Sequence, residues 1–140
     1  MMAHRRQHDE EGSILPLTIG YAIIALILIL VCADATSLYL AQKRLDALAD
    51  AAALAGADGF TLVTKGDGAT AHLTSGSVRE QAAALVADVG GGSVLVSAGS
   101  PDGTSARVEV SGQWHPPVIT VFVPDGITLH AVATSRTALE

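Results

Sequence analysis

The sequence is poor in basic residues, in aromatic residues and in cysteine. Its 140 residues include 8 Lys and Arg against 14 Asp and Glu, a formal charge of −6. Binding to nucleic acid needs a basic patch, so we expect no nucleic-acid partner. Aromatic residues make up 4% of the chain, which leaves little material for stacking platforms. The single cysteine, Cys32, allows no intramolecular disulfide.

Motifs of catalytic and cofactor-binding sites are also missing. Apart from His4 and His8, in a charged N-terminal tail that we interpret as solvated, the histidines lack metal-site spacing. The glycines at "GDG" and "GGG" do not have the spacing of phosphate-binding loops, and no serine stands in a G-x-S-x-G context. The acidic turns lack the alternating ligands of a calcium loop. We therefore expect no enzyme activity, no cofactor and no metal site.

What the sequence does contain is a long apolar run. From Ile14 to Ala33 it reads "ILPLTIGYAIIALILILVCA", 20 residues without a charge. As a helix, such a run covers about 30 Å, the thickness of the hydrocarbon core of a bilayer. Pro16 falls in the first turn, where its missing N–H is tolerated. The run predicts a transmembrane helix over 14–33, behind a short tail over 1–13.

Two alternatives compete with a permanent membrane anchor. A buried core helix would need protein cover on all sides, which about a hundred remaining residues cannot easily supply. A cleaved secretory signal is favoured by "ADA" at Ala33 to Ala35, which fits a cleavage site. However, the apolar run is longer than a signal core, and its flank "HRRQHDEEG" is net negative. We therefore favour an uncleaved anchor.

An amphipathic segment follows the apolar run with no Gly or Pro between them. Apolar residues recur there at spacings of three and four, which indicates one face of a helix that continues over 34–57. This stripe is our predicted packing surface: Leu38, Ala41, Leu45, Leu48, Ala52 and Ala55. Asp34, at the exit of the apolar run, is interpreted as a solvated residue on the helix surface. Trp114 is assigned a packing role.

The orientation in the membrane depends on weak signals. Arg5 and Arg6 precede the run, and Lys43 and Arg44 follow it, so the positive-inside count is nearly balanced. Because the tail is short and the C-terminal part is large, we expect a cytoplasmic N-terminus and an extracytoplasmic C-terminal domain.

Residues 58–140 read as a small α+β domain. "FTLVTK" from Phe60 predicts a short strand, and "GDGATAHLTSG" a polar loop. Ser77 and Glu80 match a capping box for a helix that runs to Val89, before three glycines. "VLVSA", "ARVEV" and "ITLHAVATS" predict antiparallel strands, and "HPPVITVFVPDG" predicts an edge strand or a loop lying on the sheet. Inward-facing residues are expected at Ala106, Val108, Val110, Ile127, Leu129, Ala131 and Ala133.

The segment from Glu11 to Gly59 resembles the N-terminal segment of TadE/TadG-like pilus-assembly proteins of the Tad (tight-adherence) pilus system. The residues that carry the resemblance are a Gly-Ser before the apolar run, Asp34 at its exit, and "LYLAQKRLDALADAAALAGA" beyond it. The resemblance implies a pilin-like fold and a role as a minor pilin or pseudopilin of a pilus or secretion machine. Its implied partners are membrane lipid, other pilin or pseudopilin subunits, and an inner-membrane assembly platform.

Processing is the point at which the sequence departs from a type IV pilin. Those pilins are cut after a glycine and carry glutamate as the fifth residue of the mature chain. Here Gly12 and Ser13 would flank the cut, but the fifth residue after it is Leu17. We therefore expect a permanently anchored subunit. The alternative function is a secreted or membrane-anchored small binding domain unrelated to pili.

Overall fold

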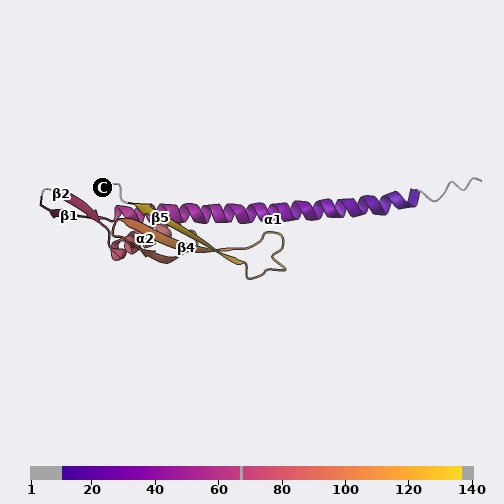
Figure 1. The fold of residues 1–140 in the computed structure, drawn as a ribbon. Coiled ribbons are helices and arrows are strands. Elements are labelled where there is room, and N and C mark those ends of the chain that lie inside the picture. The colour runs from indigo at the N-terminus through magenta and orange to yellow at the C-terminus, as the bar shows by residue number, and fades with distance from the viewer. Residues whose placement is uncertain (1–10, 67, 137–140) are drawn as a thin grey trace, which may run out of the picture.

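The computed structural model describes residues 11–66 and 68–136, so residues 1–10 of the expected tail lie outside the described part. The fold is α+β, as predicted: a long N-terminal helix, α1 (Glu11–Asp58), precedes antiparallel strands and one further helix. These are β1 (Thr61–Lys65), β2 (Gly68–His72), α2 (Ser75–Val89), β3 (Val94–Gly99), β4 (Ser105–Trp114) and β5 (Ile127–Arg136). Figure 1 shows α1 projecting far beyond the other elements.

The helix α1 runs through the apolar run and the amphipathic segment without a break. Its 48 residues include Pro16 in the second turn, and the helix continues past Gly56 to Asp58. This confirms the prediction that one helix joins both segments. The side chains of the two halves have different surroundings, however. Those from Ile14 to Ile29 are exposed, apart from half-buried Gly20, whereas one face of the second half is buried.

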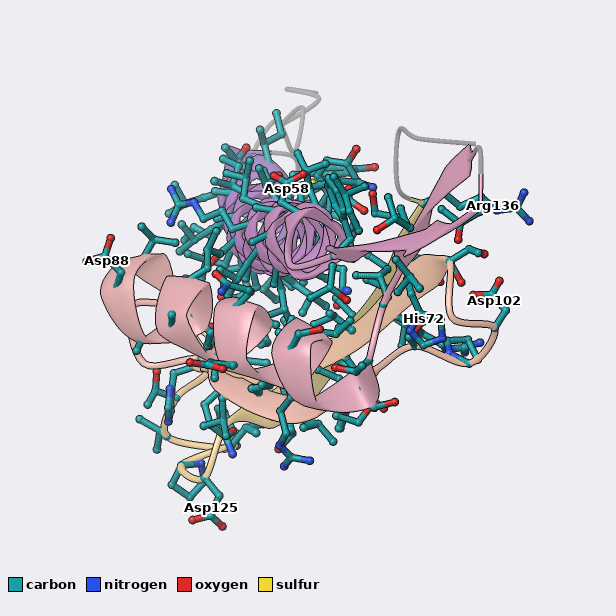
Figure 2. The ribbon with its side chains drawn as sticks, turned by 90° about the vertical axis from the view of Figure 1, so that its left-hand side faces the viewer. Asp58, His72, Asp88, Asp102, Asp125 and Arg136 are labelled. Atoms are coloured by element: carbon teal, nitrogen blue, oxygen red, sulfur yellow. The ribbon has the colours of Figure 1, made fainter. Side chains whose placement is uncertain are left out.

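The core lies where α1 and α2 cover one face of a three-stranded sheet of order β3-β4-β5. Both helices lie on the same side of these strands (Figure 2). Ala106, Val108 and Val110 point into the core. In the β4–β5 register Val108 lies opposite Ala133, and Val110 lies opposite Ala131; both alanines are also buried. The period-two prediction is therefore correct for these five residues, whereas Leu129 is half-buried and Ile127 is 44% exposed.

The helix α2 begins earlier than predicted, and its cap is a different residue. Thr74 is the N-cap: its hydroxyl accepts a hydrogen bond from the N–H of Ser77, whose own hydroxyl lies near the N–H of Thr74. The Ser77–Glu80 pair is thus not the capping box. Val78, Ala82 and Val86 are buried, whereas Val89, the last residue of the helix before Gly90, is exposed.

Two further segments differ from their predictions. The polar "GDGATAHLTSG" stretch contains β2, which pairs antiparallel with β1 through a turn at Gly66, where φ is +72°. This two-stranded hairpin is separate from the main sheet. Residues 115–126 form a loop with tight turns and no strand, so of the two forms predicted for this segment the edge strand is wrong. In Figure 1 this loop extends past the strand ends, alongside α1.

Candidate functional site

The candidate site is α1 together with the parts of the domain that contact it. Its first half is a continuous apolar surface: the large side chains from Ile14 to Val31, apart from half-buried Leu30, are about half exposed or more. This helix is long and apolar enough to cross a membrane. Gly12 and Ser13, which would flank a pilin-type cut that we expect not to occur, fall in its first turn.

The second half of α1 is the surface on which the domain sits. Of the predicted stripe, Leu45 and Ala52 are buried, and Leu38, Ala41, Leu48 and Ala55 are half-buried. The buried face is centred slightly to one side of that stripe, and it includes residues that the spacing analysis missed: Ala49, Ala53, Gly56 and Ala57. Their shared feature is small size. A run of alanine and glycine lets the helix approach its neighbours closely. The alanine-rich composition of this segment was the signal in the sequence from which the close packing could have been predicted.

The closest approach is at Gly56. A Cβ placed there would lie 2.9 Å from Cγ1 of Val78 on α2 and 3.4 Å from Cβ of Ala106 on β4. The first distance is shorter than ordinary van der Waals contact between carbon atoms, and the second is at the short end of it. Gly56 therefore allows helix, helix and sheet to meet at one point.

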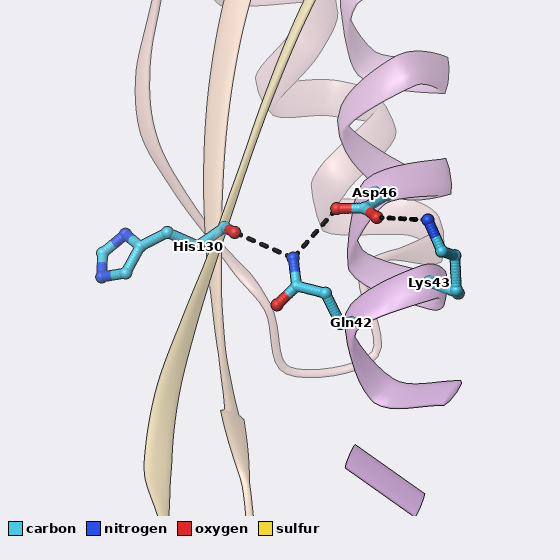
Figure 3. A network of polar contacts seen from close by, with 4 residues as sticks. All are labelled: Gln42, Lys43, Asp46 and His130. Carbon is cyan, nitrogen blue, oxygen red and sulfur yellow. Dashed lines mark hydrogen bonds and ion pairs between the residues drawn. The ribbon is translucent and has the colours of Figure 1, made fainter. Parts of the chain in front are cut away.

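A polar link joins α1 to the outer strand β5 (Figure 3). The side-chain amide of Gln42 donates one hydrogen bond to the His130 carbonyl at 3.0 Å and one to Oδ1 of Asp46 at 2.9 Å. Lys43 forms an ion pair with Asp46 at 3.3 Å. The hydrogen bond from Gln42, with a smaller contribution from Lys43, holds the pKa of Asp46 below its usual value.

Asp34 occupies the junction between the two halves of α1, and our interpretation of it as a solvated residue is wrong. It is 8% exposed, and its Oδ1 accepts a hydrogen bond from the N–H of Val118 at 3.1 Å. One turn further, Ser37 accepts a hydrogen bond from Nε1 of Trp114 at 3.2 Å. Trp114 is itself buried, which agrees with the packing role assigned to it. The cover over Asp34 comes from the loop 115–126.

An apolar groove of about 510 Å³ opens beside this junction. It is lined by residues of α1, of the adjoining ends of β4 and β5, and of the loop 115–126: Ile27, Leu30, Val31, Asp34, Ala35, Leu38, Trp114, Val118, Ile119 and Ile127. Its walls are almost entirely apolar side chains. Within residues 11–66 and 68–136, no group of three or more His, Cys, Asp or Glu could hold a metal ion. His4 and His8 lie outside this part.

One comparison with known proteins gives a match, and it falls on the helix α1. Residues 12–59 match the family model described as "Putative Flp pilus-assembly TadE/G-like". No curated protein and no solved structure matches the chain. The matched segment and α1, Glu11–Asp58, coincide almost end to end. This agrees with the resemblance predicted from the sequence: residues 12–59 match the TadE/G-like pilus-assembly model, and the rest of the chain lies outside the match.

Proposed function

We propose that the chain is a membrane-anchored, non-enzymatic component of a Tad-type pilus or secretion apparatus, similar to a minor pilin or pseudopilin. One observation supports this above all. The TadE/G-like segment is a single helix whose first half is uncovered and apolar and whose second half carries a folded domain. Such a helix can hold the subunit in a bilayer and present the domain directly at its surface.

The energetic case for an anchor comes from the exposed apolar side chains. Leaving a leucine or isoleucine side chain in water costs about 1.5–3 kcal/mol relative to burying it. Twelve large apolar residues between Ile14 and Val31 are exposed in the isolated chain. Even at partial exposure, their sum is on the order of tens of kcal/mol. Lipid or neighbouring apolar helices remove this cost, and because both are similar apolar surroundings one helix can move between them.

We propose that the span covers residues 14–33, that 34–57 is its continuation, and that 58–140 is an extracytoplasmic domain. The N-terminus would then be cytoplasmic. We also propose that Gly12 and Ser13 stay uncleaved, because Leu17 stands where type IV pilins carry glutamate.

Other pilin-like subunits are the proposed protein partners. Beyond the span, α1 keeps three large apolar side chains exposed: Tyr39, Leu40 and Leu54. They lie outside the face that the chain's own domain covers, so they are available to a neighbouring helix. We also propose an inner-membrane assembly platform as a partner, because a subunit anchored in the same membrane is within its reach.

The anchor is tested by fractionation of the full-length chain. It should stay with membranes after a carbonate wash. Replacing Ile24 to Leu28 by a charged pentapeptide should release it, since each central charge costs roughly 2.5–3.5 kcal/mol on the insertion scale. A scrambled order of the same five residues is the control and should stay membrane-bound. Release of the intact native chain would contradict the anchor.

The assembly role needs a separate test in a strain that makes Tad pili. Deleting the gene should reduce pilus assembly or secretion, and the full-length chain should restore it. Normal pili in the deletion strain, with the anchor intact, would instead favour an anchored binding domain.

A further inference from the structure

The loop 115–126 carries the most exposed apolar side chains in the described part of the domain. Val121 is 88% exposed and Phe122 is 83% exposed. Both belong to the loop that connects β4 to β5. This loop lies at the end of the sheet nearest the apolar half of α1 (Figure 1). Exposed patches of large apolar side chains mark interaction sites, so we expect an apolar partner for the tip of the loop, Val121 and Phe122.

The position of the loop along α1 indicates what that partner is. Val118 and Ile119 line the apolar groove together with Ile27 on the helix. Ile27 lies six residues before Ala33, the end of the proposed span, which is about 9 Å along a helix. If 14–33 crosses the membrane, the Val118 end of the loop, which is bonded to Asp34, lies at the membrane boundary, and the loop extends alongside α1 toward the lipid (Figure 1). The inference therefore rests on the anchor proposed above.

Four backbone N–H groups of the loop are paired within the protein, which lowers the cost of placing the loop beside lipid. In an apolar medium each unpaired N–H costs several kcal/mol, so it must be paired within the protein. The N–H of Val118 donates to Asp34, those of Phe122 and Val123 donate to the Ile119 carbonyl, and that of Gly126 donates to the Val123 carbonyl. The prolines of the loop, at 116, 117 and 124, have no N–H. These pairings hold the tip compact while its side chains point outward.

We propose that the loop 115–126 is a membrane wedge: Val121 and Phe122 insert into the leaflet that Ile27 to Ala33 enter, and lipid acyl chains fill the groove. Asp125 is exposed, and it limits the depth because a carboxylate resists entry into lipid. The bond between Asp34 and Val118 sets the height of the wedge on the helix. The domain is then fixed at the membrane by two points, the helix and the loop, and its tilt is restricted.

Spin labels on the full-length chain in phosphatidylcholine–phosphatidylglycerol vesicles test this. With Cys32 replaced by serine, a single cysteine is introduced at Ile24, Arg79, Phe122 or Asp125. Collision with oxygen, which concentrates in lipid, is compared with collision with a water-soluble nickel chelate. Labels at Ile24 and Phe122 should favour oxygen, a label at Arg79 on α2 should favour nickel, and one at Asp125 should lie between. Phe122 is 83% exposed, so its replacement removes little packing.

The outcomes separate this inference from the proposed function. A Phe122 label that favours nickel, beside an Ile24 label that favours oxygen, would overturn the wedge and leave the anchor intact. Nickel access at Ile24 as well would overturn both. A Phe122 label shielded from both reagents would mean that protein, such as a second copy of the chain, covers the tip, and it would overturn the lipid assignment.

A charge substitution provides an independent check. With the label at Val121, Phe122→Asp should shift collisions from oxygen towards nickel, because a carboxylate resists entry into lipid. The matched variant Phe122→Leu should leave the oxygen preference unchanged. Equal behaviour of the two variants would contradict insertion of this tip.

Discussion

Asp34 and Val118 are 84 residues apart in the sequence, yet a hydrogen bond of 3.1 Å joins the Asp34 carboxylate to the Val118 N–H. The bond links the last turn of the apolar half of α1 to the loop that follows β4. Asp34 is nearly buried there, beside the apolar groove. This N–H partner lowers the cost of burying the carboxylate at the junction between the uncovered apolar half of α1 and the folded domain, because a hydrogen-bonded charge costs far less to bury than an unpaired one.

Removing this carboxylate should loosen the loop. Asp34→Ala should lower the free energy of unfolding by about 1.5–3 kcal/mol, the value of a hydrogen bond to a charged group. Urea unfolding of the full chain in detergent micelles, followed by the fluorescence of Trp114, measures the loss, and amide exchange of Val118 should accelerate. Asp50→Ala is the control, since Asp50 is exposed on the same helix. Similar Val118 exchange in both variants would show that the bond does not hold the loop.

The packing face of α1 is tested by two identical substitutions on one helix. Leu45 is 5% exposed in the core, and Leu54 is 56% exposed. Leu45→Asp should destabilise the domain by about 3–5 kcal/mol, because it leaves an uncompensated buried charge. Leu54→Asp should cost about 1 kcal/mol or less, mainly in helix propensity. Both are measured by the same urea titration.

Assembly adds a second readout for this pair. If Leu54 faces a neighbouring subunit, Leu54→Asp should abolish complementation of pilus formation while stability is kept. Equal losses of stability from the two substitutions would contradict the packing face described here.

The elements that sequence analysis located correctly have an unambiguous period. The apolar run and the spacings of three and four beyond it specify one helix, and alternation in β4 specifies Ala106, Val108 and Val110 as inward. The spacings of three and four and the alternation arise from one face of an element meeting the core, whereas the apolar run indicates a helix by its length. Strand β1 was predicted, but its partner β2, and with it the β1–β2 hairpin, was missed because the hairpin does not pack on the core. Most of its described side chains, including Leu62 and Val63, are exposed, so burial imposes no alternation.

Long-range contacts account for the other differences. The burial of Asp34 depends on a loop 84 residues away, which no local pattern reveals. The start of α2 was misplaced because Thr74–Ser77 and Ser77–Glu80 have the same spacing for a capping box. The neighbouring Ser75 hydroxyl also accepts a hydrogen bond from the Ser100 N–H at 3.2 Å, which ties this earlier start to the end of β3.

The turn between β3 and β4 should make stability depend on acid pH. The hydroxyl of Ser105 and the N–H groups of Thr104 and Ser105 hold the pKa of Asp102 well below its usual value. The folded state therefore favours the charged form. Its contribution is present above the unfolded pKa, near 3.8, and is lost as pH falls from there toward the lower folded pKa.

Comparing the native chain with Asp102→Ala at a series of pH values checks this sign. The native chain should be the more stable above about pH 5, and the difference should shrink as pH falls through about 3. Ser105→Ala removes the principal hydrogen-bond donor to Asp102, so it should weaken the pH dependence. A difference that is constant over this range would contradict the role of the charged form.

The tight contact at Gly56 gives a substitution in which propensity and packing oppose each other. Alanine favours a helix over glycine by about 1 kcal/mol. At Gly56, however, its Cβ would lie 2.9 Å from Cγ1 of Val78, a side chain that is fully buried. Overpacking of this kind costs typically about 1–3 kcal/mol. Gly56→Ala should therefore destabilise the domain, by up to about 2 kcal/mol.

The control for Gly56→Ala is Gly20→Ala on the same helix, where an added Cβ meets nothing within 4 Å. It should leave the urea midpoint of the domain unchanged. Adding Val78→Ala removes the opposing methyl groups, so the double variant Gly56→Ala, Val78→Ala should lose less stability than the sum of the two single losses. If Gly56→Ala instead raised the midpoint, α1 and α2 would have room to separate. The close approach of two helices and β4 would then not be what the glycine provides.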